Sequence, residues 1–413
     1  MNILLIHQNF PGQFKHLGPA LVQRGHRVLT LTLRKGLGAD FKGIEVVNYR
    51  LERSGASGVH PWVADFEAQT IRGDACFRAA MRLRDDGFVP DLIIAHPGWG
   101  ESLFLKEVWP RAKLAIYCEF YYQLSGADVN FDPEFAREDP GVACRIRLKN
   151  LNNILHFQLA DAGIAPTRWQ ASTFPEPFRS RIMIIHDGID TKRIAPDPKV
   201  TMTLNTHAGE KMVLTQDNEV ITFVNRNLEP TRGFHIFMRA LPKILKNRPR
   251  ARVLIVGGEN KSYGASAPDG KSWKTVFTDE IRARISNQDW QRVHFVGMVS
   301  YQNFIPLLQL STVHVYLTYP FVLSWSLIEA MSAGCAIVAS DTAPVREAIR
   351  HNETGVLTDF FDVDGLSRAV CNLLDNPAQR DRLGKRARAY ALTHYDLKTV
   401  CLPLQLAWLE GLV

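Results

Sequence analysis

Residues 313–347 read VHVYLTYPFVLSWSLIEAMSAGCAIVASDTAPVRE, and this stretch decides which fold the chain is expected to adopt. It opens with the apolar run 313–317, which is typical of a buried strand. Pro320 keeps the next residues out of a helix, and a helical pattern then runs from Ser324 to Gly334. A second short apolar run follows at 336–339. Strand, loop, helix and strand in this order predict one βαβ unit of a parallel sheet.

The loop between the first strand and the helix is a candidate ligand site. In open parallel sheets, ligands bind beyond the carboxyl ends of the strands, where helices begin. Backbone N–H groups near Leu323, Ser324 and Trp325 lie at the start of the helix, so we expect them to face an anion. Glu329 follows further along the helix, where its carboxylate could reach hydroxyl groups of the same ligand.

The stretch also resembles the nucleotide-sugar signature of the family 4 glycosyltransferases, which are retaining enzymes of GT-B architecture. Their signature usually has two glutamates eight positions apart, the second followed by Ala-Met and a small residue before Gly. Residues 327–334, LIEAMSAG, match its second half, with Glu329 as the second glutamate. Eight positions earlier stands Phe321, so the first glutamate is missing.

Phe321 cannot accept the hydrogen bonds that the resemblance implies between the first glutamate and the donor sugar. Three explanations are open: the site is inactive, the loop is shifted in register, or backbone amides hold the sugar without a carboxylate. No acidic residue lies between Val313 and Ile328 to replace the glutamate. We therefore expect the third explanation, and a sugar site that is less polar than usual.

The chain begins with another strand, loop and helix. Residues 2–7 predict a strand, 14–24 an amphipathic helix and 27–31 a second strand. The glycine spacing of the dinucleotide fingerprint is absent, which disfavours NAD binding. The resemblance implies that the loop with Gly12 lies beside the donor diphosphate; the alternative is that Gly12 only makes a tight turn.

The next strands of the first half bring further candidates. The strand 92–95 ends at His96, which the resemblance implies contacts the donor sugar; the alternative is a structural histidine. The strand 115–118 precedes three residues expected on the acceptor side: Glu119, Tyr121 and Tyr122. Residues 125–139 are expected to form a loop lining the cleft, and 142–159 predict one helix.

The second half restarts the alternation with a strand at 220–224 and a helix at 234–245. The loop between them holds Arg226 and Arg232, which match two basic family positions that bind the donor pyrophosphate. Two guanidinium groups at a strand end suit a diphosphate, because each can donate paired charge-assisted hydrogen bonds. The alternative is that both are ordinary surface arginines. Gly297 and Met298 form a turn after the predicted strand 293–296 and are expected to border the nucleotide base.

The expected architecture is α/β, with two Rossmann-like domains facing a central cleft. The resemblance covers nearly the whole chain of 413 residues. Pro196, Asp197 and Pro198 mark a linker between the halves. We expect an acceptor-side domain at 1–195, a nucleotide-sugar-binding domain at 196–396, and a helix at 397–413 that crosses back to the first domain. Residues 199–218 receive no role.

The amino-acid composition excludes few classes of protein. The chain is 46% hydrophobic and 22% charged, as in ordinary globular proteins, with a formal net charge of +7. The basic balance fits a nucleotide diphosphate or an anionic membrane surface, and no motif points to nucleic acid. The cysteines are far apart, so a zinc site is not expected. No signal peptide or membrane span is evident, and we expect a cytoplasmic protein that contacts a membrane at most peripherally.

The resemblance implies a retaining, metal-independent glycosyltransferase without a further cofactor. The donor would be a UDP- or GDP-sugar. The acceptor would be a glycan, a lipid-linked molecule or a protein, in cell-surface polysaccharide or glycoconjugate synthesis. His96, Arg226 and Arg232 would act in catalysis. A catalytically inactive binding partner, which the loss of the first glutamate favours, and a GT-B epimerase or phosphorylase are the alternatives.

Overall fold

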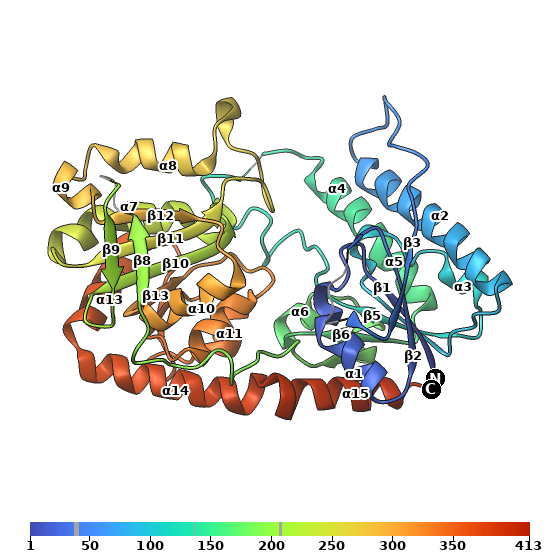
Figure 1. The fold of residues 1–413 in the computed structure, drawn as a ribbon. Coiled ribbons are helices and arrows are strands. Elements are labelled where there is room, and N and C mark those ends of the chain that lie inside the picture. Colours follow the sequence, from blue (N-terminus) through green and yellow to red (C-terminus); the bar gives the residue numbers. More distant parts are fainter. Residues whose placement is uncertain (37–40, 137, 206–208) are drawn as a thin grey trace. The chain divides into compact units, whose positions relative to one another are not determined.

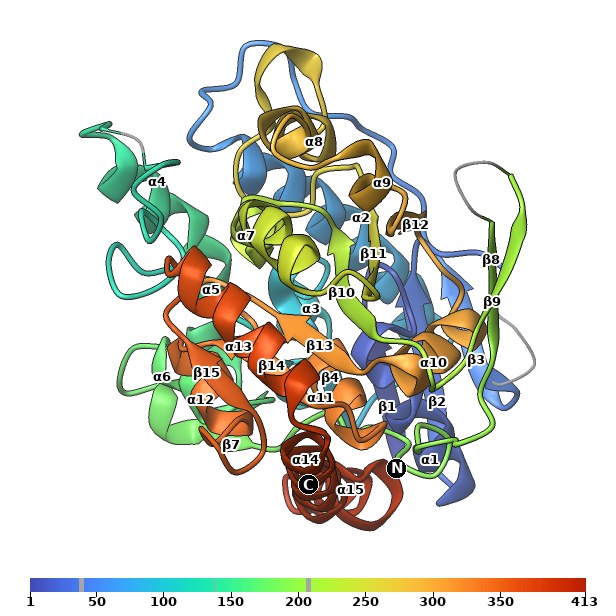
Figure 2. The same cartoon turned by 90° about the vertical axis from the view of Figure 1, so that its left-hand side faces the viewer.

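A computed structural model describes residues 1–36, 41–136, 138–205 and 209–413 (Figures 1 and 2). The chain divides into two compact units, each held together mainly by contacts between its own residues. The first unit consists of Met1–Asn130, Arg137–Asp187 and Lys398–Val413, and the second of Phe131–Ala136 and Gly188–Leu397. The short segment 131–136 therefore packs with the second unit although its neighbours in sequence belong to the first.

The first unit is a doubly wound α/β layer. Its described residues form a seven-stranded parallel sheet in the order β3-β2-β1-β4-β5-β6-β7. Side chains of β1 alternate, so Leu4 and Ile6 join one core and Ile3 and Leu5 the other. Helix α2 covers the first core, whereas α1 and α15 cover the second (Figure 1). The elements are β1 (Asn2–Ile6), α1 (Leu17–Gln23), β2 (Arg27–Thr32), β3 (Ile44–Asn48), α2 (Ala64–Asp85), β4 (Leu92–Ala95), α3 (Leu105–Val108), β5 (Lys113–Tyr117), α4 (Val142–Lys149), α5 (Leu151–Leu159), β6 (Ala162–Ala165), α6 (Arg168–Ser172), β7 (Ile182–Ile184) and α15 (Leu402–Glu410).

The second unit repeats this design. Its described residues form a six-stranded parallel sheet in the order β12-β11-β10-β13-β14-β15. Ile221 and Phe223 of β10 pack beneath α7, α8 and α13, and Val220 and Val224 pack beneath α10, α11 and α14. The elements are β10 (Val220–Asn227), α7 (Phe234–Asn247), β11 (Arg252–Gly258), α8 (Trp273–Arg282), α9 (Asn287–Trp290), β12 (Val293–Gly297), α10 (Tyr301–Leu310), β13 (Val313–Tyr316), α11 (Trp325–Ser332), β14 (Ile337–Ser340), α12 (Ala343–Ala348), β15 (Val356–Thr358), α13 (Val363–Asp375) and α14 (Pro377–Tyr395).

Each sheet has one point where its winding reverses. In the first sheet this switch point lies between β1 and β4, and in the second between β10 and β13. The chain segments that follow these two strands diverge to opposite faces, which opens space for a ligand at the carboxyl ends. The expected α/β class with two Rossmann-like domains is confirmed, and α15 returns to pack beside α1 in the first unit (Figure 1).

The single helix predicted at 142–159 is wrong, because the chain forms α4 and α5 with a break at Asn150. The Asn150 side chain is buried and pairs with the backbone of Tyr122 as a strand would. Its Oδ1 accepts from the Tyr122 N–H at 2.9 Å, and its Nδ2 donates to the Tyr122 carbonyl at 2.8 Å. The helix predicted from Phe14 likewise begins later, at Leu17, after one 3-10 turn.

Residues 199–218, which had no predicted role, include an antiparallel pair of strands. Strand β8 (Met202–Asn205) pairs with β9 (Lys211–Leu214), and residues 206–208 of this stretch lie outside the described residues. Met202, Leu204, Met212 and Leu214 pack on the core beneath α10. The two short apolar clusters in the sequence therefore extend the core of the second unit.

Among the helices that the structure describes, none is both long enough and apolar enough to cross a membrane.

Gly384 allows α14 to pack closely on the end of the signature helix α11. A Cβ at this position would stand 2.2 Å from the carbonyl oxygen of Gly334. An alanine normally favours a helix over glycine by about 1 kcal/mol. We expect the reverse for Gly384→Ala, a loss of about 1–3 kcal/mol from overpacking, seen as a lower thermal unfolding temperature.

Gly411→Ala is the matched control, because its φ of −79° suits alanine and the nearest atom to its Cβ lies 3.4 Å away. Equal unfolding temperatures for Gly384→Ala and the unsubstituted protein would contradict the close packing.

Candidate functional site

Arg232 lies at the switch point of the second sheet, where it connects the turn after β10 with the loop after β13. It ends a 3-10 turn, Pro230–Arg232, that follows β10, and its side chain is buried. Its Nη1 donates to Thr318 Oγ1 at 2.8 Å and to the Val322 carbonyl at 2.9 Å, both in the loop after β13. Gly233, with φ of 68°, brings the turn so near that a Cβ would stand 2.3 Å from Leu317 Cβ. The predicted arginine and the predicted loop are thus in direct contact.

The direct contacts of the Arg232 guanidinium are aromatic rings and neutral hydrogen-bond acceptors, and the Glu229 carboxylate lies close enough to interact with its charge. Its Cζ lies 5.4 Å from the ring centre of Tyr263 and 5.7 Å from that of Phe321. Among the described residues no carboxylate oxygen lies within 4.0 Å of its nitrogens. A buried cation whose hydrogen-bond acceptors are neutral attracts an anion, because an opposite charge recovers electrostatic energy lost on leaving water.

Glu229, in the same turn, orders the segment that carries Tyr263. Its carboxylate accepts from the backbone N–H groups of Ser262 at 2.5 Å and Tyr263 at 3.0 Å. Burial raises the pKa of Glu229 above its ordinary value, against the effect of these hydrogen bonds. Glu229 thereby holds an aromatic ring against Arg232.

Arg226, the other predicted pyrophosphate ligand, is exposed near the end of β10. Within the part of the chain that the structure describes, its guanidinium makes no ion pair or hydrogen bond. One predicted arginine is therefore fixed by the protein, and the other is available to a ligand from solvent.

The predicted amides at the start of α11 are only partly directed at a ligand. The Ser324 N–H donates to Tyr316 Oη at 2.9 Å, so the protein itself satisfies this group. Ser324 Oγ caps the helix by accepting from the Ser326 N–H at 3.3 Å. Leu323 is buried and Trp325 is exposed. The anion-binding role of Leu323, Ser324 and Trp325 stays a prediction.

Glu329 lies on α11 and is nearly buried, and Tyr301 Oη donates to its Oε1 at 2.7 Å. Burial and the neighbouring Glu329 charge raise the pKa of Tyr301, so its hydroxyl stays protonated and acts as the donor. A carboxylate offers acceptor positions for more than one donor, which fits the predicted contact with ribose hydroxyls.

Gly297 is the last residue of β12, and Met298 follows it; β12 lies two strands away from β10 in the sheet. Gly297 has φ of 73°, and Met298 is 74% exposed. The Met298 Sδ lies 3.3 Å from the position that a Cβ on Gly258 would take, at the end of β11. The predicted base-binding residues thus share the carboxyl edge of the sheet with Arg226.

The switch point of the first sheet holds the other predicted donor ligands, Gly12 and His96. Gly12 has φ of 47°, and a Cβ there would stand 2.1 Å from His7 Nε2. Burial and His96 lower the pKa of His7 to about 3, so its ring is neutral at ordinary pH. The rings of His7 and His96 are 5.3 Å apart. The two predicted residues therefore lie on either side of His7.

His96 is nearly buried and packs on Tyr117 and Trp99. Its Nδ1 accepts from the Gly98 N–H at 3.2 Å, which leaves the proton on Nε2. Nε2 lies 3.3 Å from Glu119 Oε2. His96 and the predicted acceptor-side Glu119 are thus neighbours.

Tyr121 and Tyr122 are held by the first unit itself. The Tyr121 ring stacks with Phe157 at 6.0 Å, and Lys149 Nζ lies 3.9 Å above the Tyr122 ring. Their predicted acceptor role is untested.

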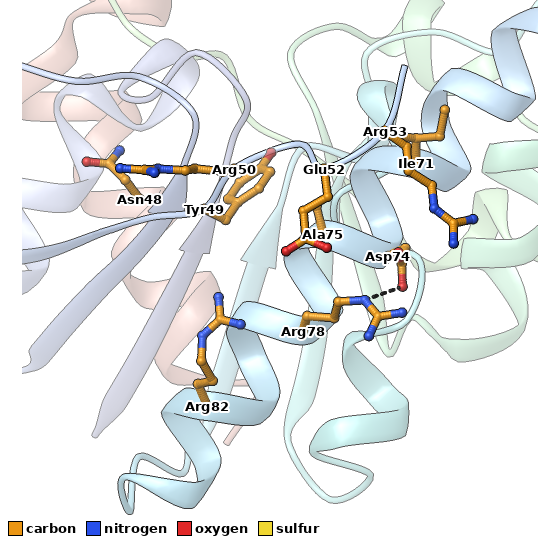
Figure 3. Close-up of a pocket in the computed structure, with 10 residues that line it drawn as sticks. All are labelled: Asn48, Tyr49, Arg50, Glu52, Arg53, Ile71, Asp74, Ala75, Arg78 and Arg82. Atoms are coloured by element: carbon orange, nitrogen blue, oxygen red, sulfur yellow. Dashed lines mark ion pairs between the residues drawn. The ribbon is translucent and has the colours of Figure 1, made fainter. Parts of the chain in front are cut away.

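A cavity of about 240 Å³ in the first unit was not predicted (Figure 3). Figure 3 shows that one wall comes from the segment after β3 and the other from α2, where Arg78 pairs with Asp74 at 3.1 Å. Its lining is rich in arginine: Arg50, Arg53, Arg78 and Arg82. No predicted site residue lines it.

Sequence reasoning missed Tyr263, Thr318 and Glu229. Glu229 stands between the two predicted arginines, so its position was a usable signal. Tyr263 lies in a Gly/Ser/Pro-rich segment without local periodicity, and only its contact with Arg232 marks it.

Comparisons with known proteins identify the family of the chain. The family described as "Glycosyl transferase family 4 group" matches residues 24–194, and that described as "Glycosyl transferases group 1" matches 209–390. The GDP-mannose-dependent alpha-(1-6)-phosphatidylinositol monomannoside mannosyltransferase of Mycolicibacterium smegmatis is 27% identical over 58% of this chain, and the match spans 60% of that relative. The glycogen synthase of Mycobacterium tuberculosis is 24% identical over 97% of this chain and 92% of its own length.

Solved structures show the same fold. Anabaena HepE in complex with UDP and glucose matches with a TM-score of 0.67 at 17% identity, covering both chains fully. Sucrose-phosphate synthase from Thermosynechococcus elongatus matches with a TM-score of 0.72 at 16% identity, over 100% of this chain and 99% of that one. The two family matches together take in both halves of the chain, which therefore belongs to the family 4, group 1 glycosyltransferases.

Proposed function

We propose that the chain is a retaining glycosyltransferase that moves a sugar from a nucleotide diphosphate to an acceptor hydroxyl. The bond between the anomeric carbon and the diphosphate breaks, and a bond from the anomeric carbon to the acceptor oxygen forms. The acceptor proton and the nucleoside diphosphate leave. The observation that carries this proposal is the buried Arg232 guanidinium, which donates to two neutral acceptors and forms no ion pair among the described residues at the switch point of the second sheet.

Charge stabilisation is the task of Arg226 and Arg232 in this proposal. The diphosphate gains negative charge as the sugar departs, and a fixed guanidinium stabilises that charge without reorganising. Arg232 is held in place by Thr318 and Val322, whereas the exposed Arg226 would close on the diphosphate as it binds.

The remaining predicted residues would bind the rest of the donor. Glu329 accepts hydrogen bonds from the ribose, and the Gly297–Met298 turn borders the base. His96 Nε2–H donates to a sugar hydroxyl, and the Gly12 turn lies beside the diphosphate. Their places at the carboxyl edges of the two sheets support these roles.

The donor class follows from the relatives: one uses GDP-mannose, and HepE was solved with UDP. We infer a UDP- or GDP-sugar donor and a glycan or lipid-linked acceptor. The protein acceptor, the peripheral membrane contact and the absence of a metal requirement remain parts of the proposal.

The test is a thermal-shift panel with UDP, GDP, ADP and dTDP, followed by a transfer assay with sugars on the nucleotide that binds. A ligand present at 100 times its Kd should stabilise the folded state by about 2.7 kcal/mol. No shift with any nucleotide would overturn the proposed function.

A catalytically inactive nucleotide-binding partner is the second candidate, and Phe321 in place of the first glutamate favours it. The panel separates the two: an inactive partner binds nucleotide but neither transfers nor hydrolyses the sugar.

Replacing Arg226 with Ala should lower kcat by up to about two to three powers of ten, the scale for losing one hydrogen-bond donor to developing charge. Because Arg226 is exposed and makes no bond to other described residues, the unfolding temperature should stay the same. Arg232→Ala should lower both kcat and stability, because two buried acceptors lose their donor.

Arg250→Ala is the matched control, an exposed arginine of the same unit with 86% of its side chain in water. Wild-type turnover in a folded Arg226→Ala, Arg232→Ala double variant would reject the diphosphate assignment.

Phe321→Glu should weaken the binding of the nucleoside diphosphate by about tenfold or more. The new carboxylate would lie near Arg232, where two opposite charges about 6 Å apart attract by about 3 kcal/mol at an effective dielectric constant of 20. Arg232 would then be partly neutralised before the diphosphate arrives. Calorimetric titration measures the change in Kd.

Phe321→Leu is the control, since it removes the aromatic face but adds no charge. Equal affinities for Phe321→Glu and Phe321→Leu would show that Phe321 does not influence Arg232 electrostatically.

A further inference from the structure

Residues 131–136, here termed the inserted segment, come from the first half of the sequence but pack in the second unit. Phe131 contacts the rings of Tyr319, Phe360 and Phe361 at 5.1, 5.4 and 5.3 Å. Phe135 contacts His235 and Trp273 at 5.2 and 5.3 Å. Two aromatic anchors thus fix the inserted segment on the second unit.

Asp132, between these anchors, is buried and holds two elements of the candidate site. Tyr319 Oη donates to its Oδ2 at 2.8 Å, and His235 Nε2, in the first turn of α7, lies 2.9 Å from the same oxygen. Its Oδ1 accepts from the Glu134 N–H at 3.0 Å. Burial acts to raise the pKa of Asp132, but the contacts with His235 and Tyr319 outweigh it and keep the pKa below its ordinary value.

Tyr319 connects Asp132 to Arg232. It follows Thr318, whose hydroxyl accepts from Arg232, and it stands three residues before Val322, whose carbonyl accepts from the same nitrogen. The Tyr319 N–H donates to the Thr231 carbonyl at 2.9 Å, in the turn that carries Arg232. Movement of Tyr319 would therefore displace both acceptors of the guanidinium.

We propose that Asp132 is a positioning residue for the donor site: through Tyr319 it fixes the loop 318–322, and thereby the direction of the Arg232 guanidinium. The inserted segment is then a working part of the nucleotide-binding unit. The inference rests on the proposed function for its effect on nucleotide binding, but not for its effect on the loop.

A metal ion is the competing explanation for this cluster, because ligand atoms of Asp132, Glu134 and His235 all lie within 4.8 Å of one another. The hydrogen bonds favour the positioning role. Both oxygens of Glu134 accept from Arg239, at 2.6 and 2.7 Å, and Asp132 Oδ2 accepts from Tyr319. Each carboxylate is already satisfied by protein donors.

The experiment compares Tyr319→Phe and Asp132→Asn with Glu134→Gln in the full chain. Tyr319→Phe removes one hydroxyl and leaves the ring contacts, so the fold should persist. Glu134→Gln is the matched control, because it lies on the same segment and alters a partly exposed ion pair with Arg239, not a hydrogen bond to the loop 318–322. The readouts are hydrogen–deuterium exchange of a peptide containing 318–324 and the Kd of the nucleoside diphosphate that gives the largest thermal shift.

We expect faster exchange of 318–324 and about five- to tenfold weaker nucleotide binding in Tyr319→Phe and Asp132→Asn, with neither change in Glu134→Gln. KM for the donor should rise more than kcat falls, because the donor site is loosened before the chemical step. Excess EDTA should leave the exchange of the unsubstituted protein unchanged, and faster exchange with EDTA would favour the metal.

Unchanged exchange of 318–324 in both variants would overturn the proposal, as would unchanged Kd beside a lowered unfolding temperature, the result of a merely structural role. Should the unsubstituted protein bind no nucleotide at all, the proposed function fails, and faster exchange in the variants would still support Asp132 as the residue that positions the loop.

Discussion

The candidate site of the second unit depends on the burial of one cation. The Arg232 side chain is buried away from water. Its guanidinium donates hydrogen bonds to two neutral acceptors and lies near two aromatic rings. Desolvation of a guanidinium is costly, and neutral partners compensate it only in part. The remaining preference is for an anion, so in the proposed function the residues that keep Arg232 in place also favour binding of a diphosphate. Glu229, Tyr263 and Thr318 all act on that one group.

The two units use the same topology for different chemistry. In each sheet the point where the winding reverses lies beside its first strand, and in each a glycine with positive φ lies near that point, Gly12 in one and Gly233 in the other. The first unit places the ring of His7 there, and burial lowers its pKa to about 3, so that ring carries no charge. The second unit places a permanent cation there. One switch point therefore holds a neutral ring whose nitrogens are hydrogen-bonded to Asn9 and Gln13, and the other holds a charge.

The sequence and the structure indicate different roles for Phe321. In the sequence it is a missing glutamate and weakens the family signature. In the structure its ring is buried, packs on Tyr263 at 4.9 Å and lies near the Arg232 guanidinium. A glutamate there would place a negative charge beside the cation, whereas phenylalanine leaves the positive charge undiminished. In the proposed function, the loss of one ligand to the sugar is thus coupled to a stronger positive potential at the diphosphate.

The sequence by itself determined the succession of strands and helices and the loops in which ligand-binding residues stand. The local signals were the apolar runs, the helical periodicity, Pro320 and Gly334. Once the strands are parallel, their carboxyl ends necessarily lie at one edge of the sheet. The tertiary structure alone decided the break at Asn150, the bond from the Ser324 N–H to Tyr316, and the docking of the inserted segment through Asp132. Each of these features depends on a partner that is distant in sequence or that a loop brings back into contact. The pattern of hydrophobic residues does not indicate which polar groups will form hydrogen bonds with one another.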